Sequence, residues 1–172
     1  MKTIVVGALI GTLFATDSAI AADAIGAHKV VAPQEIQWGT TPPSLPAGAQ
    51  AAVLYGDPQK SGLFVLRLKL PKGYKIAPHM HDQSETLTVI SGSLKLGLGP
   101  AADRASVEAL PAGGFSSMPH GVAHYALVSE DSVVQITANG PWNIEYVNPK
   151  DDPRLNGAPE PNQNELYSSK SP

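Results

Sequence analysis

Two histidines one residue apart, followed by an acid four positions later, are the residues of this sequence whose spacing could do chemistry. His79 and His81 lie in the stretch GYKIAPHMHDQSETLTVISG (73–92), and Glu85 follows them after a short polar turn. On a strand, residues i and i+2 point to the same face, so both imidazoles could share one ion, and Glu85 has the same parity. Alone, the pattern is equally typical of an ordinary alternating strand that ends in a polar turn.

A second stretch, GGFSSMPHGVAHYALV (113–128), offers a fourth candidate, because His124 begins a predicted strand there. If that strand lies across a barrel from the first, its imidazole completes a set of three histidines and one carboxylate. We interpret this set as metal ligands: His79, His81, Glu85 and His124. Such nitrogen and oxygen donors suit one divalent transition metal: Fe, Mn, Ni, Cu or Zn. Four protein ligands around a six-coordinate metal leave positions open for Lewis-acid or redox chemistry.

The elements that must position these residues are short strands. In LFVLRLKL (63–70), four apolar residues share one face and two basic residues share the other, which indicates a half-buried strand. Further strand candidates span 85–91, 93–99, 105–110, 114–119, 123–129, 132–138 and 144–148. The step Ser91-Gly92 predicts a tight hairpin between two of them. No segment has a helical stripe, so the pattern predicts an all-β sandwich or barrel.

The two stretches resemble the two sequence motifs of the cupin superfamily, in particular its small, single-domain, exported bacterial members. The fixed positions of the first motif are filled by Gly73, His79-Met80-His81, Glu85 and Gly92. Those of the second are filled by Gly113, Pro119-His120-Gly121 and His124, while Val128 replaces the usual asparagine. The resemblance covers roughly residues 50–138 and implies a double-stranded β-helix, or jelly-roll barrel. Cupins include oxygenases, isomerases and decarboxylases, so the fold does not settle the reaction.

The beginning of the chain has the layout of a secretory signal peptide, which we predict over residues 1–21. Lys2 supplies a positive start, residues 4–14 form an apolar run, and residues 19–21 match a small-x-small cleavage pattern. A membrane anchor is the alternative, but the run is too short for a hydrocarbon layer of about 30 Å. We therefore predict a periplasmic or secreted bacterial protein that leaves the membrane after cleavage.

The remainder of the chain predicts one domain with two appendages. We expect an N-terminal arm over 22–49, a β-barrel over 50–148, and a polar, flexible tail over 149–172. The arm suits a contact between copies, and we expect a homodimer. With a net charge of −3 the chain offers no basic surface for nucleic acid. It has no cysteine, which excludes thiol nucleophiles, disulfides and cysteine-based zinc sites.

The ligands' parity also predicts which residues line the site. These are Phe64, Leu66, Leu68, Leu87, Val89, Ala126, Val134 and Ile136. The lining is apolar and lacks Lys and Arg, which argues against small dicarboxylic acids as substrates. We expect Tyr125 to point out of the barrel, His120 to lie on the rim, and His28 to be exposed. Trp142 and Tyr146 could belong to the core, a dimer contact or the pocket wall.

Two functions fit these features. The first is a metal-dependent, oxygenase-type enzyme that acts on a small organic molecule, with Glu85 as a ligand that can also accept a proton. The second is a non-catalytic periplasmic protein that binds or senses a metal or a small ligand. The sequence places no other general acid or base near the metal except His120, and this scarcity keeps the second function open.

Overall fold

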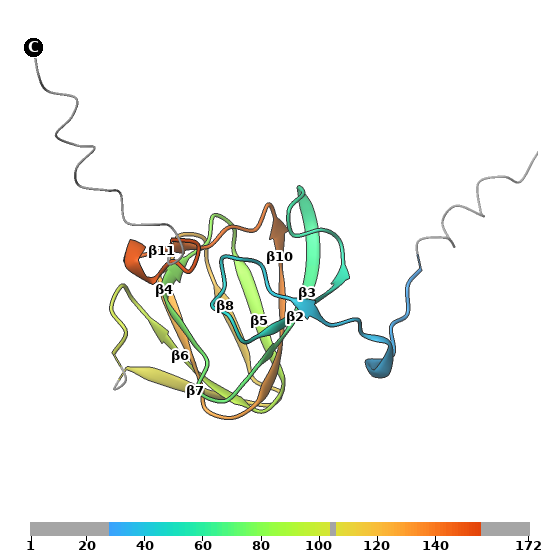
Figure 1. Cartoon of the computed structure of the whole chain (residues 1–172), viewed down its shortest axis with the longest axis horizontal. Helices are drawn as coiled ribbons and strands as arrows, with labels where there is room; N and C mark the ends of the chain where they lie inside the picture. Colours follow the sequence, from blue (N-terminus) through green and yellow to red (C-terminus); the bar gives the residue numbers. More distant parts are fainter. Residues whose placement is uncertain (1–27, 104–105, 156–172) are drawn as a thin grey trace, which may run out of the picture. The chain divides into compact units, whose positions relative to one another are not determined.

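The computed structural model describes residues 28–103 and 106–155 and contains two antiparallel sheets that face each other (Figure 1). The chain divides into the units Met1–Ala32 and Pro33–Pro172, and both sheets belong to the second. The predicted signal peptide and most of the predicted tail fall outside the described residues. The all-β prediction is confirmed. No helix in the part of the chain that the structure describes has the length and apolar character needed to span a membrane.

The larger sheet has six strands in the order β1-β2-β3-β10-β5-β8. Their bounds are β1 Gly39–Thr40, β2 Gln50–Tyr55, β3 Gly62–Leu70, β10 Ser132–Gly140, β5 Glu85–Ser91 and β8 Phe115–Met118. The smaller sheet has the order β11-β4-β9-β6-β7. Its bounds are β11 Glu145–Tyr146, β4 Lys75–Met80, β9 His124–Val128, β6 Ser93–Leu98 and β7 Val107–Pro111. Two short 3-10 helices, Pro33–Glu35 and Pro149–Asp151, flank the strands.

The core lies between the sheets and follows the alternation of the strands. In β3, the apolar residues predicted to share a face are all buried, and Phe64 is fully enclosed. Leu66 and Leu68 pair with Ile136 and Val134 of β10, so the two strands present one apolar surface to the opposite sheet. Burial of such a surface is the main favourable term in folding.

The predicted hairpin at Ser91-Gly92 is wrong. The strands on either side of it, β5 and β6, belong to different sheets, and β5 instead pairs with β10 and β8. Gly92 makes the crossing with a φ of 79°, which favours glycine, and a Cβ there would collide with Asp131 and Ser132. The glycine therefore marks a passage between the two sheets, not a turn within one of them.

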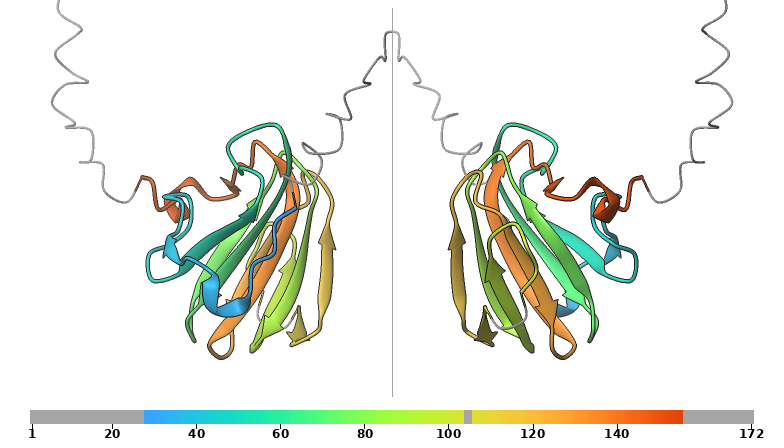
Figure 2. Two further views of the ribbon diagram at one scale, coloured as in Figure 1. Left: turned by 90° about the vertical axis from the view of Figure 1, so that its right-hand side faces the viewer. Right: turned by 90° about the vertical axis from the view of Figure 1, so that its left-hand side faces the viewer.

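The part of the predicted N-terminal arm from Trp38 onward contacts the six-stranded sheet, where β1 pairs with β2. The Lys69 ammonium of β3, the strand beside β10 (orange in Figure 2), lies 4.2 Å from the Trp38 ring, which directly precedes β1. Further along, the carbonyl of Ser44 accepts a hydrogen bond of 2.8 Å from the Tyr146 hydroxyl, and the carbonyl of Pro46 accepts one from Tyr74. These contacts tie residues 38–46 to both sheets.

Tyr125 points away from the inner cavity, as predicted, but it is buried, with 1% of its surface exposed. Its ring lies against Gly97 of the neighbouring strand β6. The Tyr125 hydroxyl donates to the Asp103 carbonyl at 2.6 Å and accepts from the Asp103 N–H at 3.0 Å. Gly97 thus leaves room for the Tyr125 ring, and the hydroxyl of that ring holds the segment after β6 through Asp103.

We expect Gly97→Ala to lower the free energy of unfolding by about 1–3 kcal/mol, because the added methyl group would overlap the Tyr125 ring. Gly39→Ala is the matched control, since the nearest atom to its Cβ would be the Ala51 carbonyl oxygen at 4.0 Å. Urea denaturation of both variants measures the difference. Equal stability of the two variants would contradict this account of Gly97.

Candidate metal centre

The three predicted histidine ligands come from two neighbouring strands of the five-stranded sheet. His79 is in β4, His81 follows the end of that strand, and His124 is the first residue of β9. His79 and His124 are direct cross-strand partners. The prediction that His124 reaches His79 from across the barrel is therefore wrong. The two imidazoles are neighbours because β4 and β9 pair, with ring centroids 4.3 Å apart.

A backbone carbonyl orients each imidazole. The pairs are His79 Nδ1 with Ala77 O at 2.8 Å, His81 Nδ1 with Asn143 O at 2.7 Å, and His124 Nδ1 with Val122 O at 3.0 Å. Because a carbonyl can only accept, each Nδ1 must carry the hydrogen, and this network assigns the tautomer. Each Nε2 keeps its lone pair, and this is the arrangement that metal-binding histidines use.

The free ring nitrogens converge on one point. One ligand nitrogen from each of the three histidines lies within 4.8 Å of the others, and all three residues are buried. His81 Nε2 is the only buried side-chain nitrogen or oxygen among the described residues that lacks a hydrogen-bond partner. A buried polar atom without a partner costs free energy, which a bound ion would remove. The residues present therefore fit a metal ion.

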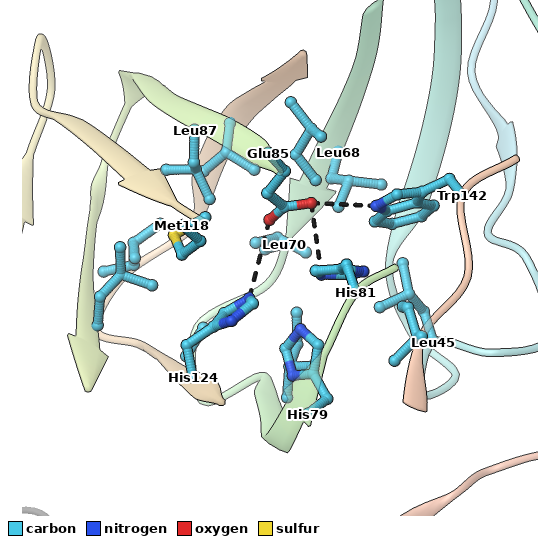
Figure 3. A pocket seen from close by; sticks show the side chains of 17 residues that line it. Leu45, Leu68, Leu70, His79, His81, Glu85, Leu87, Met118, His124 and Trp142 are labelled. Atoms are coloured by element: carbon cyan, nitrogen blue, oxygen red, sulfur yellow. Dashed lines mark hydrogen bonds and ion pairs between the residues drawn. The ribbon is translucent and has the colours of Figure 1, made fainter. Parts of the chain in front are cut away.

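Glu85 reaches the histidines from the opposite sheet, because it is the first residue of β5 (Figure 3). Its Oε2 lies 3.4 Å from His81 Nε2, an ion-pair distance without hydrogen-bond geometry, and its Oε1 lies 3.9 Å from His124 Nε2. The Trp142 indole N–H donates to Oε2 at 3.1 Å. The structure thus brings together all four predicted ligands.

Burial sets the protonation of this cluster. It lowers the pKa of His79 to about 3, with a further contribution from His124, and it lowers the pKa of His81 to about 4. Burial also lowers the pKa of His124 and raises that of Glu85 to about 7, although the Trp142 hydrogen bond opposes the latter shift. The imidazoles are therefore neutral at pH 7, as metal binding requires. A cation would offset the cost of ionising Glu85.

The sequence left the role of Trp142 open, and the structure makes it a wall of the site. Its indole stacks on the His81 ring with centroids 5.2 Å apart and an interplanar angle of 16°. The indole also packs against the Phe64 ring, with the two ring centroids 6.0 Å apart. The one sequence signal near Trp142 is the turn-forming pair Gly140-Pro141 directly before it. No spacing rule connects Trp142 with Glu85. Tyr146, by contrast, is part of the core.

The cluster opens into a small apolar cavity of about 30 Å³ between the sheets. Of the predicted lining residues, Leu68, Leu87, Ala126, Val134 and Ile136 contact it, whereas Phe64, Leu66 and Val89 are buried elsewhere in the core. In the described part of the chain, no Lys or Arg lines the cavity, in agreement with the sequence prediction. As predicted, His120 and His28 are exposed, and neither lines the cavity.

The chain matches one protein-family model, described as Domain of unknown function (DUF4437), over residues 29–165. No curated protein has a significant match to it. Solved structures do resemble it, and they show the fold.

One similar structure is the polyketide cyclase RemF from Streptomyces resistomycificus, with 18% identity, a TM-score of 0.61, and coverage of 74% of this chain and 91% of that one. A second is a putative acetylacetone dioxygenase from Methylibium petroleiphilum PM1, with 19% identity, a TM-score of 0.56, and coverage of 73% and 85%. A third is an RmlC-like cupin from Shewanella frigidimarina, with 15% identity, a TM-score of 0.51, and coverage of 66% and 91%. The fold of this chain is that of the cupins.

If the imidazoles hold an ion, His81→Ala and His124→Ala should each reduce the metal content from about one ion per chain to a small fraction of that. The metal-loaded melting temperature should fall as well, because bound metal stabilises the folded state. Elemental analysis and thermal denaturation measure both effects. His120→Ala is the control, since this exposed histidine lies outside the cavity. Full metal content in both variants would rule out this ligand set.

Proposed function

We propose that this chain, which belongs to the DUF4437 family and has the cupin fold, is an exported metal-dependent enzyme of the oxygenase type. One observation carries the proposal. Three imidazoles are fixed by backbone carbonyls so that their free nitrogens converge, two of them face one buried carboxylate, and one of those two has no hydrogen-bond partner. Building such a site costs stability, and a site of this kind is a candidate for function.

His79, His81, His124 and Glu85 would hold one divalent transition metal: Fe, Mn, Ni, Cu or Zn. When bound, the metal would supply Lewis-acid or redox chemistry. The hydrogen bonds at Nδ1 keep each imidazole ring from rotating, so that each Nε2 lone pair points toward the metal position. The apolar walls of the cavity exclude water and so strengthen every electrostatic interaction inside it.

Glu85 is the catalytic residue of the proposal. Its carboxylate borders the cavity; burial raises its pKa to about 7 without a metal, and a bound cation would lower that pKa and so favour the carboxylate form that a general base needs. Because Oε2 already accepts the Trp142 N–H, Oε1 is the oxygen that would leave the metal to take a proton from a substrate hydroxyl or activated C–H group. Among the described residues, no other acid or base except the histidines lines the cavity.

The substrate that this site favours is a small, mostly apolar organic molecule. The lining lacks a cationic side chain that could pair with a substrate carboxylate. Structures with the same fold include a polyketide cyclase and a putative acetylacetone dioxygenase, so the fold accommodates chemistry on molecules of this kind. Export rests on the signal-peptide pattern of residues 1–21, and a homodimer rests on the arm; both remain predictions.

A non-catalytic metal-binding or sensor protein is the second candidate. The specific observation in its favour is the cavity volume of about 30 Å³, which has room for an ion with a water molecule and for little else. Such a protein would hold its metal tightly and turn over nothing.

The decisive measurement is the metal content of protein purified without added metal, combined with dioxygen uptake on a panel of phenols and diketones. An enzyme should carry a redox-active metal and consume dioxygen with at least one substrate. Tightly held zinc and no uptake with any of them would favour the binding protein and overturn the oxygenase proposal.

In the same assay, we expect Glu85→Gln to lower dioxygen uptake by about 100-fold or more, because the amide cannot accept the proton. Metal content should be retained through the three histidines, and Gln can still accept the Trp142 N–H. The control is His120→Ala, which should leave uptake unchanged. A Glu85→Gln protein with undiminished uptake would remove Glu85 from the chemistry.

A further inference from the structure

The metal cavity is too small for the substrate that the proposed function requires. Its volume of about 30 Å³ compares with roughly 300–1,000 Å³ for pockets that hold organic ligands. Either the substrate displaces part of the wall, or it binds mainly in an adjoining space. The Trp142 indole forms the wall beside Glu85 and His81, so any other space that Trp142 borders is the place to look (Figure 3).

A surface pocket of about 410 Å³ shares Trp142 with the metal cavity. The arm residues after β1, the β2–β3 connection and Trp142 enclose it. Its lining residues are Thr40, Thr41, Pro42, Pro43, Ser44, Ala51, Val53, Asp57, Pro58, Gln59, Leu66 and Trp142. We call it the outer pocket. Among the residues that the structure describes, Trp142 alone lines both this pocket and the metal cavity.

Contacts on several sides hold Trp142 in place. Its main-chain N–H donates to the Pro58 carbonyl at 2.7 Å, on the outer-pocket side. Its indole N–H donates to Glu85 at 3.1 Å, on the metal side, and its ring packs against His81 and Phe64. Residues 141–144, which carry it, form no strand, so no sheet ladder fixes the segment.

We infer that the outer pocket is the binding compartment for the organic substrate, and that the Trp142 ring is the partition through which this compartment communicates with the metal cavity. This inference rests on the proposed function, because the ligand is a substrate only if the protein is an enzyme. The existence of the compartment and the role of the partition can be tested on metal-free protein.

The lining indicates the class of ligand. Proline rings and the indole offer flat apolar surfaces, while the hydroxyls of Thr40, Thr41 and Ser44 and the Gln59 amide offer hydrogen bonds. The one charged lining residue, Asp57, is paired with Lys60 at 2.9 Å. Within residues 28–103 and 106–155, no Lys or Arg lines the pocket. We therefore expect an uncharged ring compound that carries hydroxyl groups, and not a carboxylate.

The cysteine-free chain allows a direct test by disulfide tethering. Val53, which is 46% exposed, lines the outer pocket, whereas Ile90, which is 44% exposed, does not. Val53→Cys and Ile90→Cys proteins would be equilibrated with disulfides of 4-hydroxyphenyl and 4-carboxyphenyl fragments under increasing 2-mercaptoethanol. Mass spectrometry should find the hydroxyphenyl adduct at Val53→Cys surviving about tenfold more reductant than at Ile90→Cys. Equal survival at the two positions, or preference for the carboxyphenyl fragment, would overturn the pocket assignment.

A second measurement tests the partition. Met118 lines the metal cavity and is 2% exposed, so the Met118→Cys thiol should react slowly with methyl methanethiosulfonate in metal-free protein. Adding Trp142→Ala should accelerate labelling about tenfold or more, whereas Trp142→Phe, which keeps a ring in place, should not. Val128→Cys, buried at 5% exposure and outside the cavity lining, reports general loosening.

Equal rates with Trp142→Ala and Trp142→Phe would overturn the partition, as would equal acceleration at Met118→Cys and Val128→Cys. Neither thiol experiment depends on metal or turnover. Loss of the oxygenase proposal would therefore leave these results standing, and failure here would leave the metal site untouched.

Discussion

Three hydrogen bonds from imidazole Nδ1 atoms to backbone carbonyls are the interactions on which the rest of this site depends. A buried imidazole must satisfy both of its nitrogens, and a carbonyl fixes which of them carries the hydrogen. For His79 and His124 the carbonyl lies two residues earlier in the same chain segment, while for His81 it belongs to Asn143, in a distant part of the sequence. The fold therefore decides where the remaining lone pairs point.

The two sheets divide the work. The five-stranded sheet supplies the imidazoles through the pairing of β4 with β9, and the six-stranded sheet supplies the carboxylate of Glu85. The core packing that holds the sheets together also sets the distances of 3.4 Å and 3.9 Å between that carboxylate and two ring nitrogens. Stability and site geometry thus come from one apolar interior, since packed interiors have few alternative arrangements.

Much of this could be predicted from local spacing. Strand alternation identified the buried face of β3, and the positions of His79, His81, Glu85 and His124 predicted residues that the fold brings together. The errors concern long-range pairing: Gly92 crosses between sheets, and His124 lies beside His79, because strand order depends on contacts that alternation does not encode. Trp142 could not be assigned, since its partner Glu85 is 57 positions away.

Residues 141–144 contact both the metal cluster and the outer pocket. The Asn143 carbonyl orients His81, and the neighbouring Trp142 lines the outer pocket. Any displacement of this segment changes both the orientation of the His81 imidazole and the shape of the outer pocket. Thermodynamic linkage then requires reciprocity: if an occupant of the outer pocket changes the affinity for the ion by some factor, the ion changes the affinity for that occupant by the same factor.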